Sequence, residues 1–578
     1  MTLNKTGYPS IDRPWLNQYP KEAVEKDYPK ETPYQCIKRI NSPFPDKTAL
    51  MYFDRKISYQ EFLANIEQAA AALEALGVQK GDSVYVTLVS MPEVYYIFYG
   101  ANKIGAVVNF IDPRTDSNTL KHYMEIDMPK VWITLNLCFK SVEKAIGELP
   151  IPVFVLKVSE SMPAVTKVGY YFKARKQFPD ITYNDKVMHW KDFMQKGEGK
   201  TAAEAPAEWE DCSIIQHTGG STGTPKSVRL SGRKWSYSIN QYLDCGVWVD
   251  KSSIWYQELP PFVTYGLLSM HAPLLFGGFP TIVNPQFSPK DFPKQYHKYH
   301  FGYFLSAPEH FRQLVRSPIT KDDDFSHLRL MMIGGEGLPT EEEDEINAII
   351  ESRGSKTHIC KGYAMTETSG SGCVCTDINN KIGSVGLPLP KYVVKIMDPD
   401  DITRECKYNE TGEIWFSGPN VMIDYLKDPE ATDEIFVTDE DGTRWVRTSD
   451  LGYMDEEGFL FVKGRMRRIY ITDNADGAAK IFPQVPENAI RKHPDVVNTC
   501  CAGRLKKDSS MYEIVAFTVK KNDRDNDELT KELEQLVIDN CPTYMYPCQY
   551  EYINELPLLA QGKVDFRKLE EMAEELRQ

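Results

Sequence analysis

The chain has 578 residues, too many for one ordinary hydrophobic core and typical of one large and one small domain or more. Hydrophobic residues make up 42% and charged residues 26%, which is ordinary for a globular protein and argues against extended disorder. The formal net charge of −15 argues against a nucleic-acid-binding surface spread over the molecule.

Several features predict a cytoplasmic protein without a transmembrane segment. Residues 1–30 are polar and lack the apolar core of a signal peptide. The most apolar stretch, residues 262–283, is interrupted by His271 and by prolines and glycines, so it predicts buried core and not a membrane span. The 12 cysteines form no CxxC pair, and free thiols in a reducing cytosol explain them.

Helix and strand signals alternate in the N-terminal third of the chain. Ser58 and Glu61 form a possible capping box before apolar residues at helical spacing, and Gly77 ends that pattern. Strand, helix and strand patterns follow at residues 83–90, 92–103 and 106–111. This rhythm, which recurs around residues 301–336, predicts mainly parallel sheets covered by helices.

The pattern changes at about residue 390. Short alternating segments at residues 392–397 and 412–417, separated by turn residues, predict a β-rich subdomain over about 390–464. A strand at 513–519 and a helix at 527–540 with an Asp cap predict a smaller α+β unit. The predicted fold class is therefore α/β, with an N-terminal domain at residues 1–467 and a small C-terminal domain at 468–578.

A loop at residues 218–226, TGGSTGTPK, combines three glycines, four hydroxyl side chains and one lysine. Glycines allow backbone N–H groups to converge on one concavity, hydroxyls add donors, and the lysine adds positive charge. Such a loop suits a polyphosphate. It is not a Walker motif, because Pro225 separates Thr224 from Lys226. On these residues alone, a flexible surface loop is an equal alternative.

Six further motifs follow the loop. They are MIGGEGLP at 332–339, GYAMTE at 362–367, TGEIWFSG at 411–418, RTSD at 447–450, VKGR at 462–465 and QGKVDFRKL at 561–569. With these motifs in this order, the chain resembles the adenylate-forming superfamily of acyl-CoA synthetases, luciferases and peptide-synthetase adenylation domains. It is most similar to a free-standing acyl-CoA synthetase, and the resemblance covers nearly the whole chain.

The resemblance implies a two-step reaction with ATP, Mg2+ and CoA. A carboxylate attacks the α-phosphate of ATP to give acyl-AMP and pyrophosphate, and the thiol of CoA then displaces AMP. Positive charge and Mg2+ must hold the two anions together. A carrier protein as acceptor and a non-catalytic nucleotide-binding regulator are the alternatives. Retention of Lys226, Glu367, Asp450 and Lys563 argues against the regulator.

The resemblance also implies roles for single residues at the phosphates. The residues that would wrap the β- and γ-phosphates are Thr218, Ser221, Thr222, Gly223 and Lys226. Thr366 would bond the α-phosphate. Glu367 would bind Mg2+, which prefers hard carboxylate oxygens. Lys563 would bridge the carboxylate and the α-phosphate when the C-terminal domain closes.

Other residues would hold the nucleoside. Tyr363 would pack on the adenine face, and Gly335 and Glu336 would line the adenine and the acyl slot. Asp450 would accept hydrogen bonds from the ribose hydroxyls, and Arg465 would reach the ribose or the phosphate. The superfamily usually has Gly where this chain has Ser449, which crowds the turn without displacing Asp450.

Arg468 falls at the position of the superfamily's hinge, where an exposed polar residue would tolerate backbone rotation. The next segment, residues 472–480, is longer than the common form and would line the tunnel for the thiol.

The acyl pocket is predicted at Phe262, Val263, Tyr265 and Gly370. Amino-acid-activating domains place Asp at the position of Val263 to pair with the substrate's amine. Valine cannot do this, so the residues favour an apolar fatty or aromatic acid. They are equally compatible with ordinary core packing.

Overall fold

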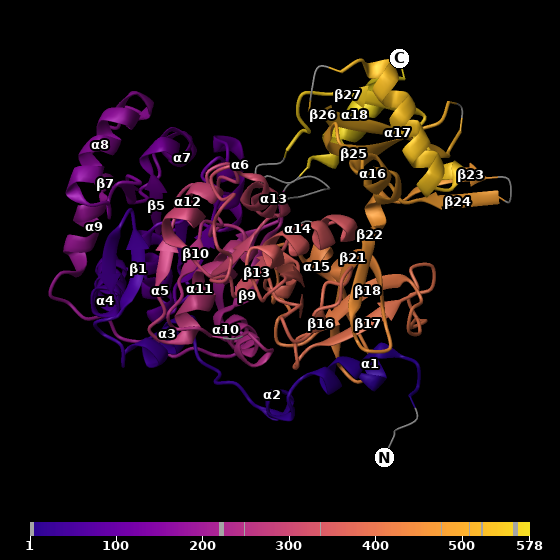
Figure 1. Ribbon diagram of the computed structural model, residues 1–578. Coiled ribbons are helices and arrows are strands. Elements are labelled where there is room, and N and C mark those ends of the chain that lie inside the picture. Colours follow the sequence, from indigo (N-terminus) through magenta and orange to yellow (C-terminus); the bar gives the residue numbers. More distant parts are fainter. Residues whose placement is uncertain are drawn as a thin grey trace.

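A computed structural model describes residues 5–218, 225–247, 249–335, 337–474, 477–507, 509–521, 524–558 and 564–577. A large N-terminal part and a smaller C-terminal unit are joined through β22 (Leu460–Arg465) (Figure 1). The two parts have separate hydrophobic cores, because the clusters of the C-terminal unit contain only residues from Tyr470 onward.

An eight-stranded sheet carries the phosphate-loop segment. Its order is β19-β9-β8-β4-β3-β5-β6-β7. The strands are β3 (Ser83–Thr87), β4 (Val107–Phe110), β5 (Val131–Leu135), β6 (Val153–Leu156), β7 (Val187–His189), β8 (Cys212–His217), β9 (Ser227–Ser231) and β19 (Asp424–Tyr425). β9 runs opposite to the other strands, because it pairs antiparallel with β8 on one side and with β19 on the other. Every residue of β3 is buried, because a parallel strand is covered on both faces, so the predicted alternation along 83–90 does not divide an inner from an outer face.

Helices cover this sheet on both faces. They include α4 (Tyr59–Ala75), α5 (Pro92–Lys103), α6 (Ser117–Ile126), α7 (Phe139–Ile146), α8 (Ala164–Ala174), α9 (Trp190–Gly197) and α10 (Gly232–Asn240). The Ser58 side chain caps α4 by accepting a hydrogen bond from the Glu61 N–H at 3.1 Å, as its sequence predicts. The Glu61 carboxylate pairs with Arg55 and does not complete a capping box.

A nine-stranded sheet lies beside the first. Its order is β16-β15-β14-β13-β12-β10-β11-β1-β2. The strands are β1 (Thr48–Tyr52), β2 (Arg55–Ser58), β10 (Trp255–Gln257), β11 (Thr281–Val283), β12 (Tyr303–Ser306), β13 (Leu330–Ile333), β14 (Ile359–Tyr363), β15 (Cys373–Val374) and β16 (Leu387–Pro388). Its helices are α11 (Thr264–His271), α12 (Phe292–Tyr299), α13 (Pro308–Arg316) and α14 (Thr340–Ser352). The six central strands are parallel, so the carboxyl ends of β10, β13 and β14 meet at one edge.

The predicted β-rich region forms an antiparallel five-stranded sheet. It contains β17 (Val393–Met397), β18 (Gly412–Ser417), β20 (Phe436–Thr438), β21 (Arg444–Met454) and β22, with α15 (Pro429–Ile435) before β20. In Figure 1, α1 (Pro9–Asp12) lies beneath this sheet, and the N-terminal segment continues through α2 (Lys21–Glu25) to α3 (Pro33–Asn41), which lies next to α5 and α10. The Ser10 hydroxyl donates to Glu405 at 2.8 Å, which ties α1 to this region.

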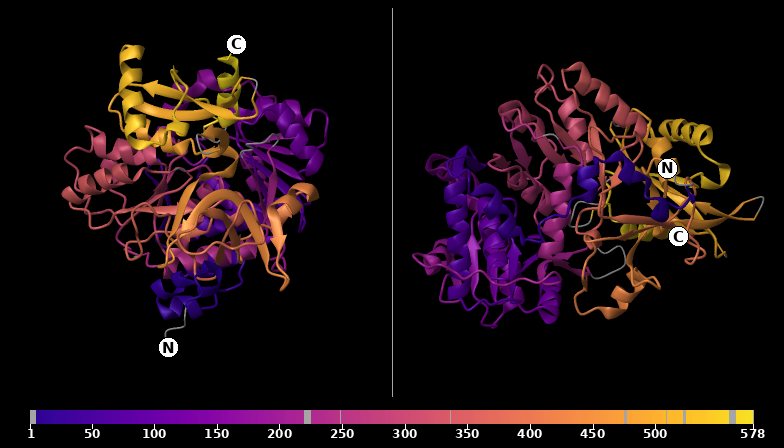
Figure 2. Two further views of the ribbon diagram at one scale, coloured as in Figure 1. Left: turned by 90° about the vertical axis from the view of Figure 1, so that its right-hand side faces the viewer. Right: turned by 90° about the horizontal axis from the view of Figure 1, so that it is seen from below.

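In its described residues, the C-terminal unit combines two small sheets and three α-helices, and Figure 2 shows it from two further sides. Its elements are β23 (Tyr470–Asn474), β24 (Gly477–Ile481), α16 (Gln484–Arg491), β25 (Val496–Leu505), β26 (Tyr512–Lys520), α17 (Asn526–Asn540), β27 (Gln549–Tyr552) and α18 (Phe566–Glu575). Within the segment at 472–480, expected as a long loop, residues 472–474 and 477–480 pair as parts of β23 and β24. Asp525 caps α17, in agreement with the predicted Asp cap.

Short 3-10 turns complete the fold. They are η1 (Pro14–Gln18), η2 (Asn136–Cys138), η3 (Arg175–Gln177), η4 (Gln241–Asp244), η5 (Ala272–Phe276), η6 (Thr366–Thr368), η7 (Met466–Arg468) and η8 (Thr543–Met545). The apolar stretch 262–283 contributes α11, η5 and β11 to the core, as predicted. All 12 cysteines are unpaired thiols. Among the described residues, no helix has the length and apolarity needed to span a bilayer.

Candidate active site

The phosphate-loop segment connects two antiparallel strands, β8 and β9. Reciprocal hydrogen bonds close its base: the Thr218 N–H donates to the Lys226 carbonyl at 3.0 Å, and the Lys226 N–H donates to the Thr218 hydroxyl at 3.2 Å. His217 supports this base through its ring nitrogens, one 2.8 Å from the Asn109 side-chain oxygen and one 3.2 Å from the Ser227 hydroxyl. The ends of the loop are therefore held rigidly at the carboxyl end of β8.

Burial lowers the pKa of His217 to about 3, so its imidazole is neutral near pH 7. The ring stacks on Tyr123 with centroids 3.8 Å apart. A neutral ring can accept at one nitrogen and donate at the other, which matches an amide oxygen on one side and a hydroxyl on the other. His217 thus shapes the loop base without adding charge to it.

Tyr425 connects Lys226 with Glu367. The Lys226 ammonium lies 4.8 Å from the centre of the Tyr425 ring, and the Tyr425 hydroxyl donates to Glu367 Oε1 at 2.6 Å. Tyr425 reaches this position because β19 pairs with β9. The backbone carbonyl of Glu367 also accepts from the Met422 N–H at 2.9 Å. A lysine and a buried carboxylate, distant in sequence, are thereby brought together across one aromatic ring.

A second group of polar side chains gathers at the end of β14. The Tyr363 hydroxyl donates to Asp450 Oδ2 at 2.5 Å, and Arg465 Nε lies 3.0 Å from Asp450 Oδ1. Asp450 faces Arg465 in the antiparallel β21–β22 register. The Asp450 carboxylate raises the pKa of Arg465. Tyr363 and Glu367 raise this pKa further. Burial is the main cause that raises the pKa of Tyr363, and the Asp450 carboxylate raises it further. The Tyr363 hydroxyl therefore keeps its proton and remains a donor.

The turn before Asp450 has a backbone conformation that favours glycine. Ser449 has φ of 56°, in the left-handed region, which explains the superfamily's usual Gly there. Buried Glu413 stabilises the turn by accepting from the Ser449 N–H at 3.1 Å and from Arg447 Nη2 at 3.0 Å. With serine at this position, Asp450 contacts Tyr363 and Arg465.

The residues predicted to line the acyl pocket converge around the start of α11. The Tyr265 hydroxyl donates to the Met332 carbonyl at 3.0 Å, and a Cβ on Gly334 would lie only 2.8 Å from the Tyr265 ring. A Cβ on Gly370 would lie 2.7 Å from the Thr264 methyl group. Glycine at these two positions allows the motif segments at the ends of β13 and β14 to pack directly against the segment that precedes α11.

Phe262 and Val263 lie in the same segment. Phe262 is buried, and the Arg114 guanidinium lies 5.9 Å from the centre of its ring. Val263 is partly buried and packs against the main core. Gly335 follows β13 with φ of 84°, a conformation that glycine adopts without strain. Thr366 is half-buried in η6, next to Glu367.

A small apolar cavity of about 30 Å³ lies between the nine-stranded sheet, α10 and α11. Its lining residues are Ile239, Tyr242, Leu243, Val247, Trp255, Leu268, Ala272, Leu275, Phe276, Leu305, Leu330 and Met332. Met332 connects it to the predicted acyl pocket, because the Met332 carbonyl accepts from Tyr265. The four residues predicted for the acyl pocket do not line this cavity.

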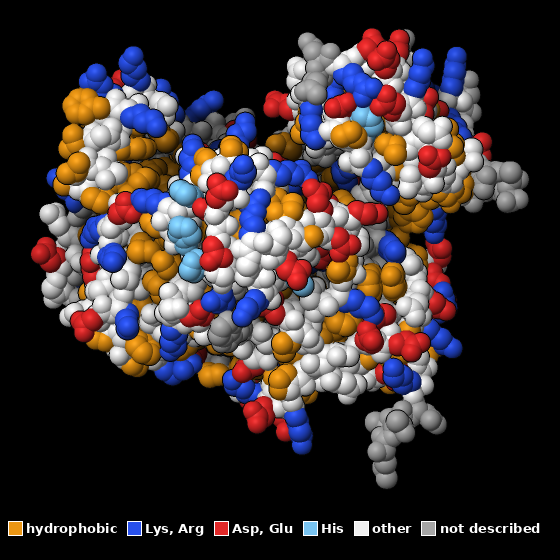
Figure 3. All heavy atoms as spheres, in the orientation of Figure 1, with side chains coloured by type: hydrophobic (Ala, Val, Ile, Leu, Met, Phe, Trp, Pro, Cys, Tyr) orange, Lys and Arg blue, Asp and Glu red, His pale blue; other side chains and the backbone are white. Residues whose placement is uncertain are grey.

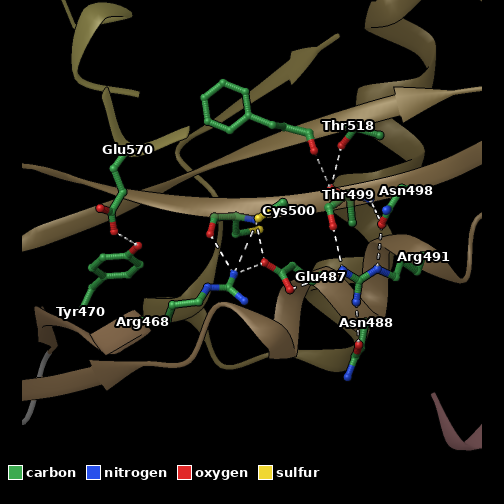
Figure 4. A network of polar contacts seen from close by, with 12 residues as sticks. Arg468, Tyr470, Glu487, Asn488, Arg491, Asn498, Thr499, Cys500, Thr518 and Glu570 are labelled. Atoms are coloured by element: carbon green, nitrogen blue, oxygen red, sulfur yellow. Dashed lines mark hydrogen bonds and ion pairs between the residues drawn. The ribbon is translucent and has the colours of Figure 1, made fainter. Parts of the chain in front are cut away.

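The predicted hinge residue differs from expectation in its exposure. Arg468 is buried, with 9% of its surface exposed, whereas an exposed residue was expected. Its guanidinium pairs with Glu487, donates to the Cys501 carbonyl at 3.2 Å and stacks 3.9 Å over the Phe566 ring. Figure 4 shows Arg468 and Glu487 beneath β25. Burial opposes the charged form, but Glu487 outweighs it and raises the pKa of Arg468. The reason for the burial is that a carboxylate and an aromatic ring of the C-terminal unit enclose this side chain.

Five predicted site residues lie outside the described part of the chain: Ser221, Thr222, Gly223, Glu336 and Lys563. Three other site residues were not predicted, namely Tyr425, Glu413 and His217. His217 precedes the glycine-rich loop directly, a position that could have drawn attention to it. Glu413 lies in the TGEIWFSG motif at 411–418, which could have drawn attention to it. Tyr425 carries no local signal, because its relevance arises from strand pairing.

The chain belongs to the AMP-binding enzyme family, since the model of that family matches residues 37–426 and the model of the AMP-binding enzyme C-terminal domain matches residues 486–563. It is 29% identical to the long-chain-fatty-acid–CoA ligase of Bacillus subtilis (strain 168), over 96% of this chain and 97% of that protein. ATP-bound MatB from Rhodopseudomonas palustris has a similar fold, with a TM-score of 0.77 and 20% identity, covering 95% of this chain and 100% of that one.

A third likeness is the anthranilate CoA ligase AuaEII in complex with anthranoyl-AMP, with a TM-score of 0.79 and 18% identity, covering 95% of this chain and 99% of that one. The resemblance to the adenylate-forming superfamily and the predicted α/β fold class are therefore confirmed. The chain is an enzyme of the AMP-forming acyl-CoA ligase family.

Proposed function

We propose that this protein activates an apolar carboxylic acid with ATP and transfers the acyl group to CoA. In the first step, a carboxylate oxygen forms a bond to the α-phosphorus as the bond to pyrophosphate breaks. In the second step, the thiol forms a C–S bond as the C–O bond to AMP breaks, and the thiol loses its proton. The observation that carries the proposal is the convergence of Lys226, Glu367, Tyr363 and Asp450 at adjoining strand ends.

The Lys226–Tyr425–Glu367 group supports the phosphate end of this site. The lysine would offset the charge of the triphosphate, with the hydroxyl of Thr218 at the loop base. Tyr425 holds one oxygen of Glu367, and the other would bind Mg2+. A single carboxylate suits Mg2+, which in nucleotide sites is held by few protein oxygens together with phosphates and water. When bound, Mg2+ would offset charge on the phosphates.

The Tyr363–Asp450–Arg465 group supports the nucleoside end. Asp450 would accept from both ribose hydroxyls, with Arg465 beside it. Tyr363 and Gly335 would line the adenine. Thr366, which lies between Tyr363 and Glu367 in the sequence, would contact the α-phosphate. Lys563, from the C-terminal unit, would complete the site during adenylation.

The apolar cavity beyond Tyr265 supports an apolar acid. None of its lining side chains carries a charge, so burying a charged or strongly polar tail there would lose hydration without compensation. The B. subtilis relative is named for long-chain fatty acids and the AuaEII structure for anthranilate, a fatty and an aromatic acid. At about 30 Å³ the cavity is small, so a longer tail would displace Met332 or its neighbours.

Transfer to CoA would require a rotation of the C-terminal unit, residues 468–578, against residues 1–467. Arg465 is tied to Asp450 on the N-terminal side, and Arg468 is tied to Glu487 on the C-terminal side. The pivot is therefore proposed at Met466 and Arg467, just before the predicted hinge residue. Surface ion pairs between the parts, such as Lys492–Glu341 at 3.4 Å, would break at little cost.

ATP-dependent pyrophosphate release, measured across fatty, aromatic and amino acids with and without CoA, tests this function. Sustained release that needs CoA and one class of apolar acid supports the proposal. Release of about one equivalent that CoA does not accelerate contradicts CoA as acceptor and indicates a carrier protein. No release with any acid, together with ATP binding, would indicate a nucleotide-binding regulator.

A specificity variant sharpens the test. Met332→Ala enlarges the cavity, and kcat/KM for an acid with a bulkier tail should rise relative to the wild-type substrate by about tenfold. The matched control is Met331→Ala, since Met331 is buried on the other face of β13, in the second core cluster. Equal shifts in both variants would contradict the placement of the acyl tail.

A further inference from the structure

Helix α8 turns an apolar face to solvent. Val165, Val168, Tyr171 and Phe172 are 87%, 58%, 50% and 63% exposed, and we call these four side chains the α8 stripe. Of the residues in α8, only Ala174 is buried. Large adjoining apolar side chains that remain in water usually mark a surface that binds something.

The α8 stripe forms one continuous face of the helix. At about 3.6 residues per turn, its four side chains lie opposite Thr166, Tyr170 and Ala174, which are turned toward the protein. Lys167 and Lys173 fall between these two faces, one on each side of the stripe. An apolar face bordered by lysines on both sides is the arrangement of helices that lie in the interface of a lipid bilayer.

The charge around α8 is opposite in sign to that of the whole chain. Residues 163–179 contain Lys167, Lys173, Arg175 and Lys176 and no acidic residue, whereas the chain has a net charge of −15. Lys167 lies 3.8 Å from the Glu160 carboxylate, and the Arg175 guanidinium lies 5.7 Å from the centre of the Phe172 ring. Figure 3 shows orange and blue side chains together at the corner of the molecule where Figure 1 places α8.

We propose that α8 docks this protein onto a lipid bilayer that carries anionic headgroups, with the helix axis parallel to the membrane surface. The α8 stripe would enter the boundary between headgroups and acyl chains, and Lys167 and Lys173 would contact headgroups on either side. Tyr171 adds an aromatic ring with a polar tip, which suits this boundary.

A second copy of the chain fits this surface less well. In a two-fold contact the same surface faces itself, which would place the basic residues of one copy against those of the other. Anionic headgroups instead offset these charges. The docking does not depend on the proposed reaction, but it would hold the enzyme where apolar acids accumulate.

Flotation of the full chain with vesicles tests the proposal. The expected result is co-flotation with phosphatidylcholine vesicles that contain phosphatidylglycerol, weaker binding to phosphatidylcholine alone, and weaker binding at high salt. The double variant Val168→Glu and Phe172→Glu should reduce binding by about a hundredfold, because anions replace two apolar side chains that would enter the bilayer. Lys173→Glu should reduce it by about tenfold.

The matched control is Ile538→Glu, which places the same charge at a similarly exposed apolar position, 51% exposed, on α17. It should bind vesicles like the wild-type chain. The α8 positions are exposed, so all variants should keep the wild-type unfolding temperature, which is measured alongside. If the wild-type chain does not bind anionic vesicles, the proposal is overturned, and a protein partner would then be the explanation for this surface. Equal loss in Ile538→Glu also overturns it.

Discussion

Arg465 and Arg468 are three residues apart, and each forms an ion pair with a different part of the molecule. Arg465 pairs with Asp450 in the candidate site, and its side chain is about half exposed, at 54%. Arg468 pairs with Glu487 inside the C-terminal unit and is buried. The difference teaches that the junction is anchored at both ends, so the proposed rotation would be absorbed in the short stretch between them.

The largest effect is expected from a variant in the C-terminal unit. Lys563→Ala should lower the rate of adenylation by about a thousandfold or more, because this variant loses the charge that is proposed to bridge the carboxylate and the α-phosphate. Thioester formation from supplied acyl-AMP should stay within about twofold of wild type. Single-turnover measurement of each half-reaction checks this, and equal loss in both steps would contradict the assigned role.

Asp450→Ala removes the ion-pair partner of Arg465 in the N-terminal part, and this variant should weaken nucleotide binding. Loss of a buried acceptor beside Arg465 and Tyr363 should weaken ATP affinity by about a hundredfold. Isothermal titration with ATP measures the effect. Tyr363→Phe removes only the hydroxyl and should weaken binding by about tenfold or less. An unchanged affinity in the Ala variant would exclude Asp450 from the nucleotide site.

Glu487→Gln would break the anchor of Arg468. A buried guanidinium without its carboxylate should lower the free energy of unfolding of the C-terminal unit by about 3 kcal/mol. Glu341→Gln is the control, because its pair with Lys492 lies at the surface and should contribute less than about 1 kcal/mol. Chemical denaturation resolves the two values. A small effect of Glu487→Gln would show that Arg468 is not the anchor.

Acid should destabilise the N-terminal part through His271 and His217. Burial lowers the pKa of each to about 3, below the ordinary value of 6.5, so the folded state keeps them neutral while the unfolded state takes up protons. Stability is therefore lost as pH falls below about 6.5, by about 2 kcal/mol per histidine at pH 5. Denaturation of wild type and His271→Gln across this range checks it, and an identical pH dependence in both would contradict it.

Ser449→Gly should have the smallest effect. Glycine relieves the left-handed strain at φ of 56° but gains freedom in the unfolded chain, so stability should change by less than about 1 kcal/mol. Thermal unfolding measures it, with ATP affinity as a second readout. A larger loss would mean that the serine side chain contributes contacts of its own.

The fold was predictable where local pattern and burial agree. The helix at Pro92–Lys103 and the strand at Gly412–Ser417 have the predicted bounds, because each depends on a short periodic pattern with clear ends. The β23–β24 hairpin was not predicted, because the sequence at 472–477, TDNADG, is typical of a turn or loop and the strand pairing does not follow from periodicity.

For the site, the sequence alone determined the family and the positions of the motifs, because their order and residue types reflect chemistry that tolerates little change. Only the tertiary structure decided how these positions meet. Tyr425 reaches Glu367 through the pairing of β19 with β9, and Arg468 is buried because Glu487 and Phe566 close over it. Contacts between residues distant in the chain depend on packing, which local sequence patterns do not encode.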